Sequence, residues 1–401
     1  MRIGVDACCW ANGRGYGRFT RELLRTMVRQ APAAEWLFYM DAPVERVFDL
    51  MAPNARVVRV PQGRPPIEAG SVAHRSPADI LRFTSAVRRD RPDVFFSPSI
   101  YTYFPLPPGQ RAVVAIHDTI AERFPELTLP TARDRLFWRA KVKLAAVQAG
   151  LVMTVSEYSA RELTSVLRID PARIRVVTEA PADAYCPGET GEIAAAAARI
   201  GLRDGDRWFT YVGGFNPHKR VDTIVKAHAE VVRARSDEPP HLLLVGATER
   251  DGFHDNVAEI RAAVQACGTG AFVHWTGYLP DQELRHLHAG ATALVLVSEA
   301  EGFGLPAVEA AACGAPVIAT TESPLPELLA GGGIFVKPGD KPALAAAMVR
   351  LLDEPELRAR MGGIARSQAS RLSWDDAARA ALDALREAAG SRAISPGKAT
   401  A

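Results

Sequence analysis

The stretch that decides the fold is Ser298-Glu299-Ala300-Glu301-Gly302-Phe303-Gly304-Leu305-Pro306-Ala307-Val308-Glu309. It follows an apolar run at residues 293–297, which predicts a buried strand. Pro306 suits the first turn of a helix, because its missing N–H group has no partner to lose there. A strand, a glycine turn and a helix in this order predict one repeat of a parallel α/β sheet.

Two carboxylates flank this turn. Glu301 lies in the turn, and Glu309 lies about one helical turn beyond the expected helix start, so both can face the carboxyl end of the strand. Open parallel sheets bind ligands at that end. The N–H groups of Phe303, Gly304 and Leu305 can meet an anion at the helix start. Either glutamate alone also fits a solvated residue near a helix N-terminus, but the whole pattern indicates a sugar nucleotide.

Short apolar runs alternate with helical patterns in both halves of the chain. Strands are expected at residues 3–6, 36–40, 57–60, 94–97, 113–117, 151–155 and 174–177, and again at 208–212, 242–245, 272–275, 293–297 and 317–319. Helices are expected at 17–29, 77–89, 132–149, 159–167, 221–235, 256–267, 282–289 and 305–313, with later ones between 341 and 389. This alternation predicts two Rossmann-like α/β/α domains that face a central cleft.

The domain limits follow from the breaks in this pattern. Residues 180–191, with Pro181, Pro187 and Gly188, predict a linker. We therefore expect an N-terminal domain at 1–185 and a C-terminal domain at 186–372. A helix at 373–390 follows, and the tail at 391–401 is expected to be disordered.

Composition restricts the class of protein. The chain has 401 residues, of which 48% are hydrophobic and 23% charged, as in ordinary globular proteins. It has no apolar run of membrane-spanning length, its first residues predict a strand rather than a signal peptide, and its five cysteines suit a reducing compartment. We therefore expect a cytoplasmic protein with free thiols.

The charge is unevenly distributed. Residues 1–185 carry 26 lysines and arginines against 19 aspartates and glutamates, whereas the remainder carries 22 against 27. A basic first half suits an anionic surface or acceptor, although it also fits an arginine-rich composition.

Two segments of the first half carry candidate ligand residues. Asn12-Gly13-Arg14-Gly15-Tyr16-Gly17-Arg18 opens a helix with alternating glycines, which let the backbone approach a ligand. It is not a dinucleotide fingerprint, because Arg18 occupies the place of the third glycine; Asp41 nevertheless keeps a NAD dehydrogenase open as an alternative. In the second segment, His117 lies at the end of the fifth strand, either as a structural or as a functional histidine.

The second half begins with another strand, turn and helix. Lys219 and Arg220 lie near the expected helix start, where the dipole disfavours cations, so we interpret them as ligands of a diphosphate. Asp204-Gly205-Asp206 formally matches a metal-binding pattern, but its position before a strand favours a turn. No other cluster of histidine, cysteine or acidic residues predicts a metal site.

Taken together, these segments resemble family 4 of the retaining glycosyltransferases, which have the GT-B fold. Glu301 and Glu309 have the spacing of that family's E-x7-E motif, and the similarity extends over the segments 12–18, 117–118, 155–159, 211–220 and 277–280. The resemblance implies a retaining, metal-independent hexosyltransferase without a cofactor. It also implies that the helix at 373–390 crosses back onto the first domain.

The resemblance assigns roles to individual residues. It makes His117, Lys219 and Glu301 the catalytic set: His117 near the reacting carbon, Lys219 on the diphosphate and Glu301 on the sugar hydroxyls. The remaining donor-binding positions are Gly15, Gly17, Gly214, Arg220, Tyr278, Phe303, Gly304, Leu305 and Glu309, the last on the ribose. Gly214 departs from the family, because many members have an arginine there as a second diphosphate ligand. Arg220 is a candidate replacement.

The donor and acceptor are less constrained. The turn at 213–219 and the segment 117–119 look most like mannosyltransferases, which implies GDP-mannose as donor and a glycan or lipid-linked acceptor in the synthesis of a surface polysaccharide or glycolipid. A UDP-hexose is the alternative, followed by a sugar-nucleotide epimerase on the same fold and by a binding module without activity. The helix at 132–147 mixes apolar and basic residues, so it either packs on the sheet with a solvated basic side or rests on anionic lipid, as a peripheral membrane contact. No nucleic-acid partner is expected.

Overall fold

The computed structural model describes residues 1–61, 75–248 and 255–390. The chain forms two compact units. Unit 1 contains the described residues up to Glu179 and those from Trp374 onward, and unit 2 contains the described residues between Ala180 and Ser373. The boundary expected after residue 185 therefore falls within the range of unit 2, and the tail at 391–401 lies outside the described residues.

Unit 1 is built on a seven-stranded sheet with the order β3-β2-β1-β4-β5-β6-β7, in which all neighbouring strands are parallel. The strands are β1 (Arg2–Asp6), β2 (Glu35–Met40), β3 (Ala55–Arg59), β4 (Val94–Ser97), β5 (Ala112–Ala115), β6 (Leu151–Thr154) and β7 (Ile174–Val176). The helices are α1 (Gly15–Gln30), α2 (Ala42–Glu45), α3 (Pro77–Asp90), α4 (Ile120–Arg123), α5 (Pro125–Thr128), α6 (Ala132–Gln148), α7 (Glu157–Leu167) and α16 (Trp374–Gly390).

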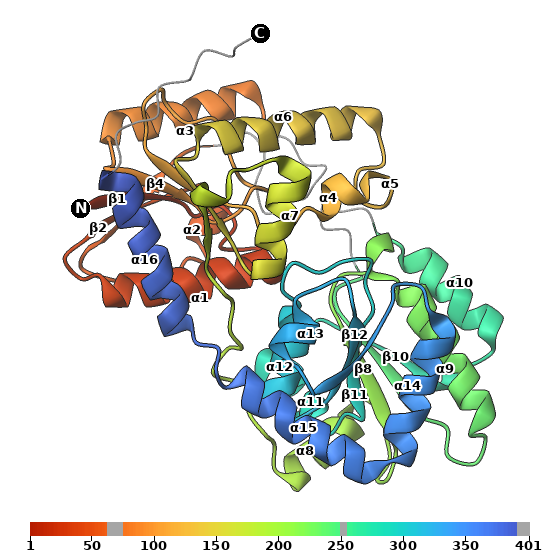
Figure 1. Ribbon diagram of the computed structural model, residues 1–401. Helices are drawn as coiled ribbons and strands as arrows, with labels where there is room; N and C mark the ends of the chain where they lie inside the picture. The colour runs from red at the N-terminus through yellow and green to blue at the C-terminus, as the bar shows by residue number, and fades with distance from the viewer. Residues whose placement is uncertain (62–74, 249–254, 391–401) are drawn as a thin grey trace. The chain divides into compact units, whose positions relative to one another are not determined.

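The last helix completes unit 1. α16 packs against α1 (Figure 1), and Arg29 of α1 pairs with Asp375 at 2.6 Å. Near the other end of α16, Glu387 pairs with Arg175 of β7. Trp374 is buried with its ring centroid 6.2 Å from that of Phe19. The helix therefore belongs to the core of the unit that contains the first strand.

The opposite face of this sheet is covered by α3 and α6. Ala112 and Val114 are two residues apart on β5, so their side chains point to the same face. Ala112 packs with Phe83 of α3, and Val114 packs with Trp138 of α6. The two helices therefore share one face of the sheet.

Unit 2 has a six-stranded parallel sheet with the order β10-β9-β8-β11-β12-β13. The strands are β8 (Trp208–Val212), β9 (His241–Val245), β10 (Val273–Gly277), β11 (Ala293–Leu296), β12 (Val317–Thr320) and β13 (Gly333–Val336). The helices are α8 (Thr190–Arg199), α9 (Val221–Ala234), α10 (Val257–Cys267), α11 (Asp281–Ala289), α12 (Leu305–Ala312), α13 (Leu325–Leu328), α14 (Lys341–Asp353) and α15 (Pro355–Ala369). The expectation of two Rossmann-like parallel units is confirmed.

Several local predictions were wrong. The linker expected at 180–191 ends in α8, whose alanine-rich sequence packs Ala196 and Ala197 into the core. β13 was not expected, because its short run is only partly buried. β5 ends at Ala115, so His117 lies beyond the strand rather than in it, and α1 begins at Gly15 rather than Gly17.

The strand order marks one ligand-binding edge in each unit. In unit 1 the order reverses between β1 and β4, and in unit 2 it reverses between β8 and β11. Loops diverge to opposite faces at such a point, which leaves a crevice beside the carboxyl ends of the strands. In unit 2, the segments around Lys219 and Glu301 follow these two strands.

Candidate active site

The centre of the unit 2 site is a partly buried ion pair. Lys219 Nζ lies 2.7 Å from Glu301 Oε1, and the side chains are 19% and 9% exposed. Ser298 Oγ donates a hydrogen bond of 2.6 Å to the same carboxylate oxygen. A cation and a carboxylate predicted from separate motifs are thus held together at the strand-order reversal.

Two further contacts tie the loops after β8 and β11. The Glu299 N–H donates to the His218 carbonyl at 2.8 Å, and the Arg220 guanidinium pairs with the Glu299 carboxylate. Arg220 has a left-handed backbone, with φ of 52°, between the 3-10 turn Pro217–Lys219 and α9. This conformation costs a non-glycine residue free energy, and the Glu299 pair is one contact that holds it. Sequence reasoning missed Ser298 and Glu299, although both adjoin the motif.

The turn before α12 has the conformation that the glycine motif predicts. Gly304 has φ of 87°, and a Cβ added there would lie 2.8 Å from Leu325 Cδ1. Pro306 lies in the first turn of the helix. Within the described part of the chain, the N–H groups of Phe303, Gly304 and Leu305 have no hydrogen-bond acceptor. They are therefore available to an anion.

Both glutamates of the motif are buried, at 7% exposure for Glu301 and 3% for Glu309. The alternative of solvated residues at a helix start is therefore wrong for both. Because buried carboxylates are expensive unless they are hydrogen-bonded or paired, their burial supports a specific role.

The turn after β8 shows why glycine is required there. Gly213 has φ of 151°, and the Tyr211 hydroxyl donates to the Gly214 carbonyl at 2.5 Å. A Cβ on Gly246, after β9, would lie 2.1 Å from the Gly213 carbonyl oxygen. These close approaches hold the loop that leads to Lys219.

Tyr278 stands at the end of β10, two strands from β8. Its side chain is 67% exposed and follows Gly277, whose φ is 71°. The neighbouring Trp275 is covered by the Arg261 guanidinium, 4.5 Å from the ring centroid. An exposed aromatic ring at this edge of the sheet is available for stacking.

The Asp204-Gly205-Asp206 segment forms a turn, as expected. The Arg203 N–H donates to Asp206 Oδ2 at 2.7 Å, and His241 Nε2 lies 3.4 Å from the same oxygen. The segment precedes β8, so it lies at the opposite end of that strand from Lys219. No group of three or more potential metal ligands occurs among the residues that the structure describes.

In unit 1, His117 is partly buried and its imidazole is held in the neutral form. Its Nε2 lies 2.9 Å from the Pro98 carbonyl oxygen, and its Nδ1 lies 3.9 Å from Glu179 Oε1. Burial lowers the pKa of the imidazole to about 4. The ring is therefore uncharged near neutral pH, with Nε2–H donating to Pro98 and Nδ1 bearing a lone pair.

The glycines of the first loop differ in their surroundings. Gly15 is the first residue of α1, and a Cβ there would meet no atom within 4 Å. A Cβ on Gly17 would lie 2.0 Å from the Asn12 carbonyl oxygen. Close packing within the protein thus explains Gly17, whereas Gly15 borders open space.

A second polar cluster, not predicted from the sequence, lies after β1 and β2. Arg75 Nη2 is 3.8 Å from Asp6 Oδ1, and its guanidinium lies 4.3 Å from the Phe83 ring centroid. Burial raises the pKa of both Asp6 and Asp41. Asp41 Oδ1 accepts from the Val44 N–H at the start of α2, a local role that does not require a nicotinamide nucleotide. Asp6, the charged residue at the end of the predicted first strand, was the sequence signal from which this cluster could have been predicted.

Comparison with protein families agrees with this architecture. The description "Glycosyl transferases group 1" matches residues 193–368, and "Glycosyltransferase Family 4" matches residues 13–179. The chain is a family 4-like GT-B glycosyltransferase. The described residues of each matched range fall within one of the two structural units.

The relatives of this glycosyltransferase include a mannosyltransferase and D-inositol 3-phosphate glycosyltransferases. It is 26% identical to O-antigen chain mannosyltransferase B of Escherichia coli over 382 residues, which cover 93% of this chain and 96% of the relative. It is 34% identical to D-inositol 3-phosphate glycosyltransferase of Frankia alni over 230 residues, or 56% of each chain. The second alignment thus spans about half of that relative.

Solved structures resemble the whole glycosyltransferase chain in fold. Sucrose-phosphate synthase from Thermosynechococcus elongatus has a TM-score of 0.75 at 20% identity, covering 96% of this chain and 98% of that one. WaaG, a glycosyltransferase involved in lipopolysaccharide biosynthesis, has a TM-score of 0.73 at 15% identity, covering 96% and 99%. Among the described residues, no helix is long and apolar enough to span a membrane. None of the five cysteines in this part of the chain forms a disulfide.

Proposed function

We propose that this glycosyltransferase transfers a mannosyl group, with retention of configuration, from GDP-mannose to a glycan or lipid-linked acceptor. The observation that carries the proposal is the Lys219–Glu301 pair beside the free N–H groups of the α12 turn. The near full-length similarity to an O-antigen mannosyltransferase supports mannose and a surface polysaccharide or glycolipid.

In the proposed donor complex, the loops after β8 and β11 both contact the donor. Lys219 and the N–H groups of Phe303 and Gly304 contact the diphosphate, and Glu301 accepts hydroxyls of the sugar. Glu309 accepts the ribose hydroxyls. Tyr278 borders the base, and Gly214 and Leu305 line the same turns.

The proposed reaction needs stabilisation of a leaving group rather than an enzyme nucleophile. As the bond between the sugar and the phosphate breaks, negative charge grows on the diphosphate. Fixed positive potential from Lys219 stabilises that charge without reorganisation. The acceptor hydroxyl attacks the same face of the sugar, and its proton passes to the departing phosphate oxygen. His117 contributes a neutral imidazole near the reacting carbon, and Gly15 leaves backbone room for phosphate or acceptor.

Arg220 has to exchange its partner if it is to bind the donor diphosphate. Its guanidinium is paired with Glu299 in the structure. For Arg220 to replace the arginine that many family members have at the position of Gly214, a donor diphosphate must compete with Glu299. A diphosphate carries more negative charge than one carboxylate, so this exchange is favourable on electrostatic grounds.

A panel of nucleotide sugars tests the donor. A ligand at one hundred times its dissociation constant raises the free energy of unfolding by about 2.7 kcal/mol, so thermal shifts rank GDP-mannose against UDP-hexoses. We expect the largest shift with GDP-mannose. A larger shift and faster transfer with a UDP-hexose would refute the mannosyl assignment.

Product analysis tests the reaction. Retention predicts a product with the donor's anomeric configuration, read by NMR, and metal independence predicts full turnover in excess EDTA. Inversion, or EDTA inhibition reversed by manganese, would contradict these two assignments. Conversion of the nucleotide sugar without any acceptor would indicate an epimerase instead.

A second acceptor class has its own support. The D-inositol 3-phosphate glycosyltransferase of Frankia alni shares 34% identity with this chain over the aligned residues. Transfer to a phosphorylated cyclitol, faster than transfer to mannose-containing glycans, would favour that function over polysaccharide synthesis.

A further inference from the structure

Helix α6 of unit 1 has two apolar sides, of which only one faces the protein core. Trp138, Val142 and Ala145 are buried against β5 and β6. The opposite side is exposed along its whole length, from Ala132 to Val147. A surface helix of a globular protein is normally polar on that side, so α6 departs from the usual pattern.

Large apolar side chains are concentrated on this exposed side. Leu136 is 69% exposed, Phe137 46%, Leu144 38% and Val147 65%. In the described part of the chain, ten large apolar side chains are exposed, and α6 holds these four. Single exposed apolar residues are normal on a protein surface, but four of them on one helix form a group that suggests an interaction site.

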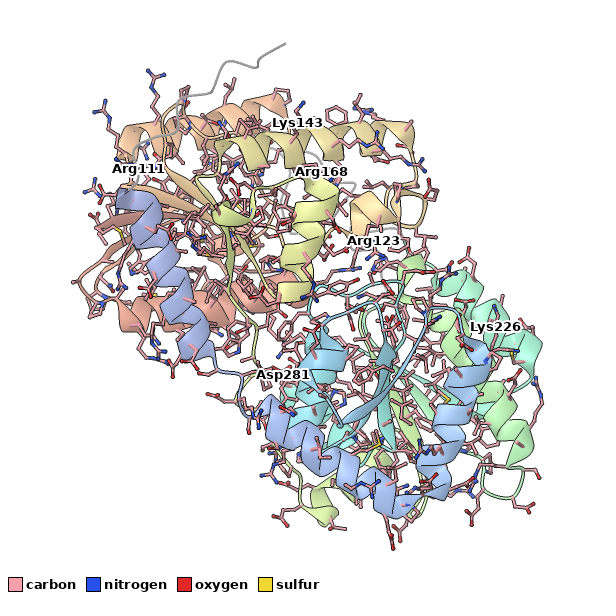
Figure 2. All side chains as sticks on the ribbon, viewed as in Figure 1. Arg111, Arg123, Lys143, Arg168, Lys226 and Asp281 are labelled. Carbon is pink, nitrogen blue, oxygen red and sulfur yellow. The ribbon has the colours of Figure 1, made fainter. Side chains whose placement is uncertain are left out.

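The charges on the same side all have one sign. Arg133, Arg139 and Lys143 are exposed, and Figure 2 shows Lys143 on the outer side of α6. The one acidic residue of the helix, Asp134, is hydrogen-bonded to Thr131 at the helix start. Two other basic residues point elsewhere: Lys141 donates to the Tyr101 carbonyl, and Arg135 donates to the Leu129 carbonyl.

A neighbouring helix extends this surface. α3 covers the same face of the sheet as α6, and its outward residues include Leu81, 66% exposed, and the exposed Arg88. Both helices run along the upper part of unit 1 in Figure 1. The outer surface of α6, as the term is used below, comprises Arg133, Leu136, Phe137, Arg139, Lys143, Leu144 and Val147.

We propose that the outer surface of α6 binds an anionic membrane surface. Apolar side chains interleaved with lysine and arginine match a bilayer interface, where the apolar groups enter the acyl boundary and the cations meet lipid phosphates. A second copy of this surface would bring like charges together. A nucleic-acid backbone offers no partner for the apolar residues. The proposal does not depend on which sugar the enzyme transfers.

Co-sedimentation with vesicles tests the proposal without any substrate. The full chain is mixed with zwitterionic phospholipid vesicles, with or without an anionic phospholipid. We expect binding to the anionic vesicles at low salt and weaker binding near 1 M salt, where the screening length falls to about 3 Å. No sedimentation at low salt overturns the proposal.

Two variants separate the charge from the apolar contribution. R133Q/R139Q/K143Q removes three cations, each worth roughly fivefold in partitioning, so binding should fall on the order of a hundredfold. L136Q/V147Q removes the most exposed apolar pair and should weaken binding at least tenfold, at low salt and at high salt.

Matched controls lie elsewhere on the chain. R199Q/R360Q/R366Q removes three exposed arginines of unit 2, and V47Q/M51Q removes two exposed apolar residues of unit 1. Both should bind vesicles like the parent. Equal losses in controls and test variants overturn the proposal, as does a concentration-dependent dimer that L136Q/V147Q abolishes while vesicle binding is absent. Thermal unfolding of each variant identifies any that fail to fold.

Discussion

Replacing Lys219 with alanine separates the structural from the chemical contribution of its pair with Glu301. Lys219 Nζ and Glu301 Oε1 are 2.7 Å apart, with side chains 19% and 9% exposed, so the pair is partly buried. Removing one partner of a fully buried pair typically costs about 3–5 kcal/mol of unfolding free energy, and partial exposure of Lys219 reduces that cost. Ser298 still donates to Glu301 in the variant, so we expect K219A to lose about 2–3 kcal/mol.

A double-mutant cycle isolates the pair. E301Q leaves a lysine that can reach water, so it should lose about 1–2 kcal/mol, and K219A/E301Q should lie within about 1 kcal/mol of the parent. Urea unfolding measures all four free energies. A matched control is K226A on α9, where Figure 2 labels Lys226. Lys226 pairs with Asp222 at 2.8 Å, but its side chain is 49% exposed, so the change should stay below about 0.5 kcal/mol.

Turnover should behave differently from stability. K219A should lose about 2–4 kcal/mol of transition-state stabilisation, or roughly 30- to 1000-fold in rate. K219A/E301Q should regain stability and remain inactive. The reasoning is refuted if K219A unfolds like the parent, or if K219A or K219A/E301Q keeps near-normal turnover with the preferred donor.

Three further predictions concern single residues. R220A should weaken donor binding about tenfold, measured by titration calorimetry, whereas E299Q should not weaken it; equal losses would indicate that the pair acts only by holding the loop. G304A should destabilise the fold by about 1–3 kcal/mol in urea, because alanine at a φ of 87° is strained and its Cβ would lie 2.8 Å from Leu325; an unchanged midpoint would contradict this geometry. Burial lowers the pKa of His288 to about 3. Below about pH 6.5 the unfolded chain therefore binds a proton at this residue that the folded chain does not. Through this group, the free energy of unfolding should fall by about 1.4 kcal/mol from pH 7.5 to pH 5.5. H288Q should flatten that slope, and an unchanged slope would argue against a neutral buried ring.

Most strands of the two sheets could be predicted from the sequence because both sheets are covered on both faces. Strands such as β4, β5, β11 and β12 are buried at every position and read as continuous apolar runs. β13 lacked this signal because three of its four residues are only partly buried. α8 was missed because its N-terminal residues continue a segment rich in proline and glycine.

The positions of the site motifs could also be predicted, but their partners could not. Strand ends locate Lys219 and Glu301, because the carboxyl ends of parallel strands meet at one edge. That Ser298 and Lys219 share one oxygen of Glu301 depends on side-chain placement. That Arg220 pairs with Glu299 depends on a left-handed backbone that a non-glycine residue rarely adopts.

The membership of α16 in unit 1 bears on synthesis of the chain by the ribosome. The strands of unit 1 emerge first, yet the helix that packs on α1 is encoded at 374–390. Unit 2 has all its elements once Ser373 has emerged, so it can finish folding while unit 1 still exposes the apolar side of α1. The half made first therefore matures last, and until then the exposed apolar side of α1 is a surface through which the chain can aggregate.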